Sequence, residues 1–138
     1  MDAQRRAVIV WGAFCIAVAA FFAVALSVHM PPRKDVLRPL LGIAAAMTVG
    51  CLAASRLLPE RIKRPRGASR EQFALQRHII ACALCESAAL FACVVLLITR
   101  SSIAGGIAAV GYTALLLLYP GLERWQKLLG PDDARESY

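Results

Sequence analysis

Long apolar segments alternate with short polar ones along this chain. The four apolar segments cover residues 7–30, 39–55, 79–99 and 103–119. A helix needs about 20 apolar residues to cross the hydrocarbon core of a bilayer, within a range of about 17–25. Lipid offers the backbone no hydrogen-bond partners, so segments of this kind form helices. The pattern predicts an all-α fold, a four-helix transmembrane bundle made by a single membrane domain, residues 1–138.

Prolines and polar residues set the expected ends of these helices. Pro31 and Pro32 end the first helix, and the second is expected to end before Pro59, because proline cannot continue the hydrogen-bonded ladder. Ser69 is expected to cap the third helix, with Gln72 as its partner three residues later. The first apolar segment is longer than the 7–15-residue core of a signal peptide, so we expect it to be retained. The predicted transmembrane helices cover residues 7–29, 37–58, 73–99 and 102–119.

The C-terminal segment is expected to lie on the membrane rather than across it. Residues 121–130 carry apolar side chains at helical spacing between charged ones, which is typical of a short amphipathic interfacial helix. Trp125 is expected to lie at the level of the lipid headgroups. Arg56 and Arg77 are expected to anchor the second and third helices at the same interface. Residues 131–138 are predicted to form a disordered tail.

The charges favour one orientation of the helices. The chain is 59% hydrophobic, which is too apolar for a soluble domain of this size, and it carries a net charge of +7. The N-terminal segment, the loop 56–78 and the C-terminal segment together hold 12 Lys and Arg, whereas the two opposite turns hold four. Because cytoplasmic loops are rich in Lys and Arg, we expect both termini in the cytoplasm. The predicted setting is a bacterial inner (plasma) membrane, with the lipid bilayer and not nucleic acid as partner.

Glu86 is the one charged residue inside the third apolar segment. A charge at the middle of a bilayer costs roughly 2.5–3.5 kcal/mol on insertion scales. Glu86 is therefore expected to be neutral at pH 7 and to face other helices, on one stripe with Cys82, Ala89 and Cys93. It lies eight residues past His78, or about 12 Å from the end of the helix at 1.5 Å per residue.

Three residues with hydroxyl groups are expected at the depth of Glu86. They are Thr48 in the second helix and Tyr112 and Thr113 in the fourth. Each is a candidate hydrogen-bond partner for the carboxyl group, and the sequence places no Lys or Arg at this depth. Three roles for Glu86 stay open. They are interhelical glue worth about 0.6–2 kcal/mol, a site for a proton or cation, and a contact with a polar group of a partner subunit.

An ordered set of residues surrounds Glu86. An arginine-proline loop and an alanine-leucine pair precede the acid, and an aromatic residue and a valine- and leucine-rich run follow it. These are Arg64-Pro65, Ala83-Leu84, Phe91 and the run 94–97. In type and order, residues 37–98 resemble the helical hairpin of the rotary ATPase proteolipid, the c subunit, although the loop here is longer. The resemblance implies that Glu86 binds the translocated proton or sodium ion.

The five cysteines all fall within the predicted helices, at positions 15, 51, 82, 85 and 93. An odd number of buried thiols is not typical of a disulfide framework, so we expect small packing residues. A soft-metal site made by Cys82, Cys85 and Cys93 is the alternative. No cofactor is expected, because His29 and His78 are predicted at opposite membrane faces and a membrane haem needs two histidines at matching depth.

Small residues spaced four apart give a packing signal. Gly42 and Ala46 form one such pair, and Gly105 and Ala109 form another, and such pairs allow close helix approach within a bundle or with a partner. We recognise no nucleophile–base pair or phosphate loop, so we expect no catalytic residue and no enzyme. The sequence predicts a small, non-catalytic subunit or accessory of a membrane complex, associated with a protein partner or with copies of itself. Ion translocation by Glu86 and soft-metal handling are the alternatives.

Overall fold

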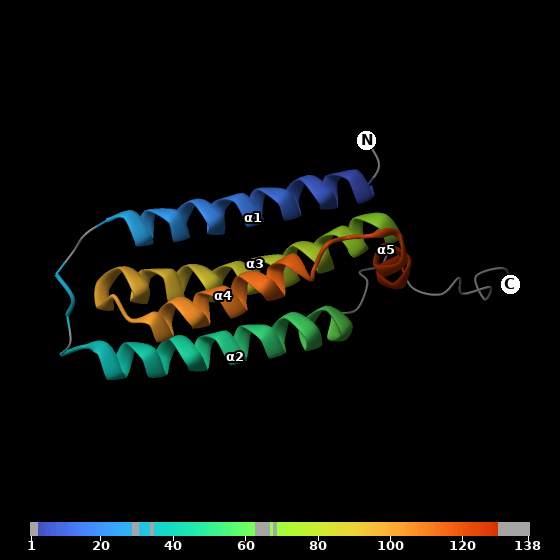
Figure 1. Ribbon diagram of the computed structural model, residues 1–138. Helices are drawn as coiled ribbons and strands as arrows, with labels where there is room; N and C mark the ends of the chain where they lie inside the picture. Colours follow the sequence, from blue (N-terminus) through green and yellow to red (C-terminus); the bar gives the residue numbers. More distant parts are fainter. Residues whose placement is uncertain (1–2, 29–30, 34, 63–66, 68, 130–138) are drawn as a thin grey trace, which may run out of the picture.

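The described part of the computed structural model contains five α-helices (Figure 1). It describes residues 3–28, 31–33, 35–62, 67 and 69–129. The helices are α1 (Ala3–Ser27), α2 (Leu37–Arg61), α3 (Arg70–Thr99), α4 (Ser102–Leu116) and α5 (Leu122–Leu129). No strand occurs in the described part of the chain, which confirms the all-α fold. The predicted tail, residues 131–138, lies outside the described residues.

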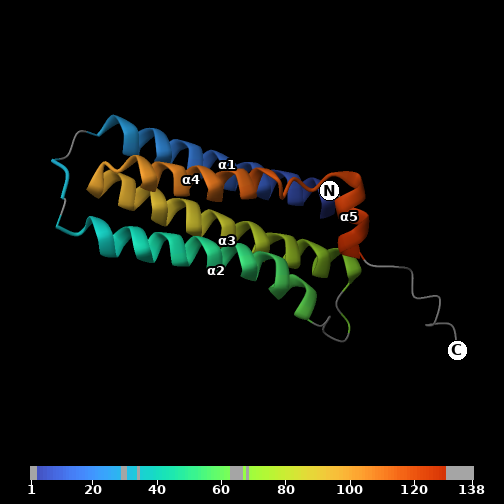
Figure 2. The same cartoon turned by 60° about the horizontal axis from the view of Figure 1, so that its bottom comes forward.

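Helix α3 is the centre of the structure. The other three long helices each pack against it, and α1 and α2 lie on different sides of it (Figure 1). Helix α5 lies across one end, next to the N-terminal end of α1 (Figure 2). The axes of the four long helices are roughly parallel, and their chain directions alternate, so the start of α1, the end of α2, the start of α3 and α5 meet at one end.

Small residues fill the core of this structure, and large apolar residues cover its outside. The buried face of α3 is made by Ala81, Cys82, Cys85, Ala88, Ala89, Ala92 and Cys93. In contrast, Ile16 is 71% exposed, Val49 68% and Ile103 62%. Water would penalise so many large exposed apolar side chains, whereas lipid does not. The distribution is therefore typical of a helix bundle surrounded by lipid.

Three helices have the length and composition to cross a membrane. They are α1, α3 and the segment Leu37–Leu58 of α2. Helix α4 is equally apolar but has only 15 residues, or about 22 Å at 1.5 Å per residue, against a hydrocarbon core of about 30 Å. The expectation of a regular fourth helix over residues 102–119 is therefore corrected to Ser102–Leu116.

Helix α4 ends early because the chain tightens before a proline. The amides of Leu118 and Tyr119 donate to the carbonyls three residues back, Leu115 and Leu116, at 3.0 and 3.1 Å. This is the tighter bonding pattern that often closes a helix. Pro120 follows, and it has no amide hydrogen with which to continue.

The structure confirms the predicted cap of α3 but not the predicted end of α2. Ser69 caps α3 as expected, since its hydroxyl oxygen accepts a hydrogen bond from the amide of Gln72 at 3.2 Å. The prediction that α2 ends before Pro59 is wrong, because α2 continues to Arg61. A proline inside a helix removes one backbone bond and bends the helix. The last turns of α2 do bend away from α3 (Figure 2).

The turn between α3 and α4 is as short as predicted. Arg100 takes the left-handed conformation there, with φ of 54°, and its Nη1 donates to the carbonyl oxygen of Ala25 at 2.7 Å. This bond reaches a carbonyl in the last turn of α1, where the helix leaves acceptors without backbone partners. The turn therefore ties α1 to the α3–α4 hairpin at the end opposite α5.

Helices α3 and α4 approach each other closely at Gly111. A Cβ atom built on Gly111 would lie 3.1 Å from the N, Cα and Cβ atoms of Ala89. Ala104, Ala108 and Leu115 lie on the same buried face of α4. The pairs of small residues noted in the sequence do not form this buried contact. Gly42, Ala46 and Ala109 are exposed, and Gly105 is only half-buried.

Candidate functional site

Glu86 lies at the edge of the buried face of α3, where it is half-buried. Its neighbour Cys85 faces the core, and successive helical residues point about 100° apart, which turns Glu86 toward the flank. None of the hydrogen bonds and ion pairs of the described residues involves Glu86. The expected stripe is thus only partly buried, with Cys82, Ala89 and Cys93 inside and Glu86 at its margin.

The predicted hydroxyl partners do not gather around Glu86. Thr48 is 5% exposed, and its Oγ1 is buried without any hydrogen-bond partner, so the predicted bond from Thr48 to Glu86 is absent. Thr113 is exposed on α4, and Tyr112 is half-buried against a core cluster formed by α1, α3 and α4. These four residues therefore do not form a hydrogen-bonded site within this chain.

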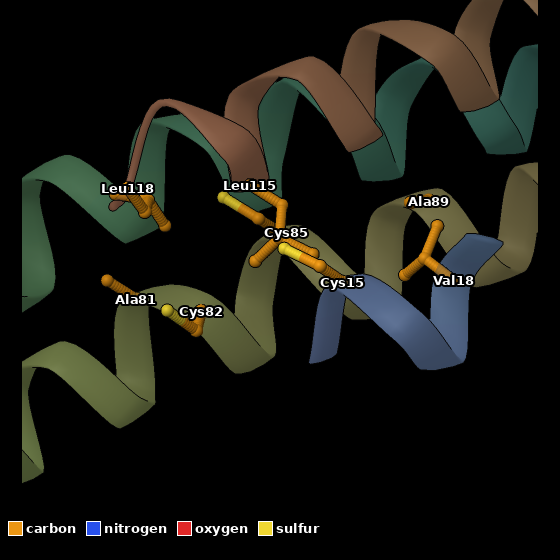
Figure 3. Close-up of a cluster of buried hydrophobic side chains, with 8 residues drawn as sticks. All are labelled: Cys15, Val18, Ala81, Cys82, Cys85, Ala89, Leu115 and Leu118. Carbon is orange, nitrogen blue, oxygen red and sulfur yellow. The ribbon is translucent and has the colours of Figure 1, made fainter. Parts of the chain in front are cut away.

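Four of the five thiols are divided between two clusters, and Cys51 belongs to neither. Cys15, Cys82 and Cys85 pack with Leu115 and Leu118 where α1, α3 and α4 meet, and Figure 3 shows these side chains converging from the three helices. Cys93 belongs to a separate cluster near the other end of α3. All five cysteines are free, and the described residues contain no group of three His, Cys, Asp or Glu side chains placed to hold a metal ion. The soft-metal alternative therefore has no three-ligand site in the part of the chain that is described.

Helix α5 is fixed across the end of the bundle by Trp125. The Trp125 side chain is 6% exposed and packs with Ala7 of α1 and Ala74 of α3. The indole therefore contacts protein over most of its surface. Little of it is left for the predicted contact with lipid headgroups. Leu122, in the first turn of the same helix, is 65% exposed.

A cavity of about 500 Å³ opens between α2, α3 and α5. We call it the basic pocket, because four of its side chains are cationic and one is acidic. The bend at the end of α2 and the crossing of α5 leave this space between helices that pack closely elsewhere (Figure 2). Its lining residues are Ser55, Arg56, Arg77, His78, Ala81, Glu123, Arg124, Lys127 and Leu128.

Arg124 lies at the centre of the charge in this pocket. Its Nη1 donates to the carbonyl oxygen of Leu117 at 2.6 Å, which holds the guanidinium against the end of α4. Burial lowers the pKa of Arg124, and the positive charge of Arg56 lowers it further. Among the described residues, Arg56, Arg124 and Lys127 form no ion pair, even though Glu123 lines the same pocket. The pocket therefore carries uncompensated positive charge.

His78 forms the deep wall of the basic pocket. It is 2% exposed, and its Nε2 lies 3.5 Å from Sγ of Cys82, one turn further along α3. A buried histidine is costly unless its nitrogens find partners. The thiol of Cys82 supplies one such weak partner.

A second cavity of about 210 Å³ lies between α2 and α4, beside the basic pocket. We call it the apolar slot. Its walls include Leu52, Ala114, Leu117 and Leu118, together with Cys85 at its base. Ser55, Arg56 and Arg124 line both cavities and mark the boundary between them. A charged recess and an apolar one are thus adjacent at this end of the structure.

The sequence predicts Arg56 and Arg77 only as interface anchors, and it counts Arg124 only among the C-terminal charges that orient the helices. The signal that could have found the basic pocket was the topology itself. In an up-and-down bundle, the end of the second helix, the start of the third and the residues after the fourth all lie at one end. Basic residues at these three positions must therefore come close together, but their separation depends on the bend of α2 and the docking of α5.

Comparison with protein-family models, with curated proteins and with solved structures found no match for this chain.

Proposed function

We propose that this chain is a small integral membrane protein that acts as a non-catalytic subunit or accessory of a membrane complex, through the outward face of α2. The observation that supports this role is a row of small exposed residues, Gly42, Ala46, Gly50 and Ala53, which we call the α2 face. Their spacing of three or four residues puts them on one side of the helix. A Cβ atom built at Gly42 or Gly50 would meet nothing within 4 Å.

Small residues on a lipid-facing surface are useful mainly for contact with another helix. They let two backbones approach closely, so that dispersion and weak hydrogen bonds replace lipid contacts. Large side chains that suit lipid, such as Ile16, Val49 and Ile103, also point outward from α1, α2 and α4. The two exposed glycines in the row, Gly42 and Gly50, favour α2 as the helix that meets a partner, or the same helix of a second copy.

The orientation we propose places the end with the N-terminus and α5 in the cytoplasm, in a bacterial inner membrane. Arg56, Arg77, Arg124 and Lys127 gather at this end in the structure. Loops rich in Lys and Arg remain on the cytoplasmic side during insertion. In this orientation α4, with the irregular turn that follows it, returns the chain to the cytoplasmic side.

Substitution of Ala46 by isoleucine tests the α2 face. The larger side chain would hold the partner helix away, and we expect association to weaken at least tenfold, or about 1.4 kcal/mol. Fluorescence energy transfer between labelled copies, or co-purification in mild detergent, measures this. Ala17→Ile on the exposed side of α1 is the control and should change nothing. Equal association of the Ala46→Ile variant and the unmodified chain, or a monomer without any partner, would overturn the proposal.

A second candidate function rests on Glu86 as a site for a proton or cation. Glu86 is half-buried, and no hydrogen bond or ion pair within the described residues occupies its carboxyl group. Interhelical glue requires such a bond, so this observation favours an exchangeable acid or an acid that meets a partner. The proteolipid resemblance supports the ion-binding role.

Substitution of Glu86 by glutamine separates these roles. If Glu86 carries the ion, Glu86→Gln should abolish proton or sodium flux into vesicles and reaction with a hydrophobic carbodiimide, while the helical content stays unchanged. Glu71→Gln, in the first turn of α3, is the control for loss of one exposed acid. Flux that persists in the Glu86→Gln variant would exclude ion translocation. Loss of co-purification without any effect on flux would assign Glu86 to the partner contact.

A further inference from the structure

We propose that the basic pocket and the apolar slot together bind one phosphate-bearing amphiphile, an anionic phospholipid, with its phosphate among the cationic side chains and an acyl chain in the slot. This site goes beyond the proposed role of the α2 face and does not depend on it. It lies at the end of the structure where α5 crosses, between α2, α3, α4 and α5.

The side chains of the basic pocket have the chemistry that phosphate requires. Three guanidinium groups come from Arg56, Arg77 and Arg124, and Lys127 adds an ammonium group. Guanidinium groups bind phosphate oxygens through paired, charge-assisted hydrogen bonds. The single acid, Glu123, is outnumbered four to one, so the pocket attracts anions. Basic pockets of this kind between transmembrane helices recognise lipid headgroups.

Arg56 and Arg124 are placed to bind one anion together. The two side chains line both cavities, and neither forms an ion pair among the described residues. Their mutual repulsion is part of what lowers the pKa of Arg124. A phosphate between them would replace repulsion by attraction, and Ser55 on the same boundary offers a neutral hydroxyl donor. The volume of about 500 Å³ lies within the range of about 300–1,000 Å³ of ligand sites.

The slot favours a lipid over free phosphate. It begins at the same three residues as the basic pocket and continues along apolar walls between α2 and α4. Leu117, one of these walls, is 66% exposed, so the slot is continuous with the outward apolar surface of α4. A phospholipid can therefore enter from the bilayer, with its chain along Leu52, Ala114 and Leu117. Inorganic phosphate would use only the charged half.

The test compares lipids on the purified full chain in neutral detergent. Binding of phosphatidylglycerol, phosphatidylcholine and inorganic phosphate is measured by native mass spectrometry and by the shift of the thermal midpoint. We expect phosphatidylglycerol to bind at least tenfold more tightly than phosphatidylcholine. Equal binding of the two lipids would overturn the proposal. Inorganic phosphate is expected to compete only at much higher concentration. Competition at equal concentration would show that the site binds free phosphate and not a lipid.

Two variants locate the site, and one pair serves as a matched control. Lys127→Gln, an exposed position, and the double variant Lys127→Gln/Arg124→Gln should weaken phosphatidylglycerol binding progressively, by about tenfold or more in the double variant. Arg5→Gln/Arg6→Gln removes two exposed charges from the same end of the structure and should leave binding unchanged. Retention of full affinity in Lys127→Gln and in the double variant would overturn the site, and so would an equal loss in the control.

The slot has its own test. Ala114→Leu enlarges a half-buried wall residue and should weaken binding of phosphatidylglycerol but not of inorganic phosphate. Unchanged binding of both would remove the acyl chain from the proposal. Because these readouts do not depend on association through α2, failure of the lipid site is distinguishable from failure of the subunit role. A monomer that binds phosphatidylglycerol specifically would support the lipid site and overturn the subunit role.

Discussion

Replacing Trp125 by alanine is expected to detach α5 from the end of the bundle. The Trp125 side chain is 6% exposed and packs against Ala7 and Ala74, and truncation of a buried tryptophan costs about 3–5 kcal/mol. A loss of 3 kcal/mol is more than a hundredfold in the docking equilibrium. The cost falls on α5 first, because the core clusters along α3 do not include it. The basic pocket loses one wall in the same step.

Trypsin cleavage after Arg124 and Lys127 measures this detachment. The Trp125→Ala variant should be cut at these positions far faster than the unmodified chain, while the segments within the membrane stay protected. Leu122→Ala is the matched control, because Leu122 is in the same helix but 65% exposed. Equal cleavage rates for the unmodified chain and the Trp125→Ala variant would show that Trp125 does not hold α5 in place.

Alanine at Gly111 is expected to force α3 and α4 apart. The new Cβ atom would lie 3.1 Å from the N, Cα and Cβ atoms of Ala89, which no side-chain rotation can move away. Overpacking of this kind typically costs about 1–3 kcal/mol. Only a shift of one backbone relative to the other relieves it, so the whole α3–α4 contact is affected.

Thermal unfolding in detergent, followed by circular dichroism, tests this expectation. Gly106→Ala in the same helix is the control, because a Cβ atom at Gly106 meets nothing within 4 Å. That change removes flexibility from the unfolded chain and should leave stability equal or raise it by about 0.4–1 kcal/mol. If both variants unfold at the same temperature, the close contact at Gly111 is not made in solution.

The sequence predicted the elements well, because their signals are local. Apolar length indicated the helices, and Ser69 and the prolines placed most ends within a few residues. Pro59 was misleading because a helix can continue, bent, beyond a proline. Likewise, the early end of α4 depends on the tight turn before Pro120, which apolar composition does not reveal.

Which faces are buried could not be read from the sequence. Alanine and glycine are equally suited to a core and to a lipid-facing contact, so Gly105 and Ala109 looked as likely to pack inside as Ala108 and Gly111. Glu86 follows the buried Cys85 by one residue, and this turn of about 100° around the helix places it at the flank and not in the core. The basic pocket was out of reach for another reason, because the relative placement of Arg56 and Arg124 depends on how α2 bends and α5 docks.

The central place of α3 has a consequence for the order in which the protein assembles during synthesis. Within the described residues, α1 and α2 pack mainly on α3 and not on each other. Helices α1 and α2, which leave the ribosome before α3, therefore have little to recognise in one another and remain separate in the bilayer. Packing among these helices begins when α3 is inserted, so nascent chains that stall before it should be the ones exposed to quality-control proteases.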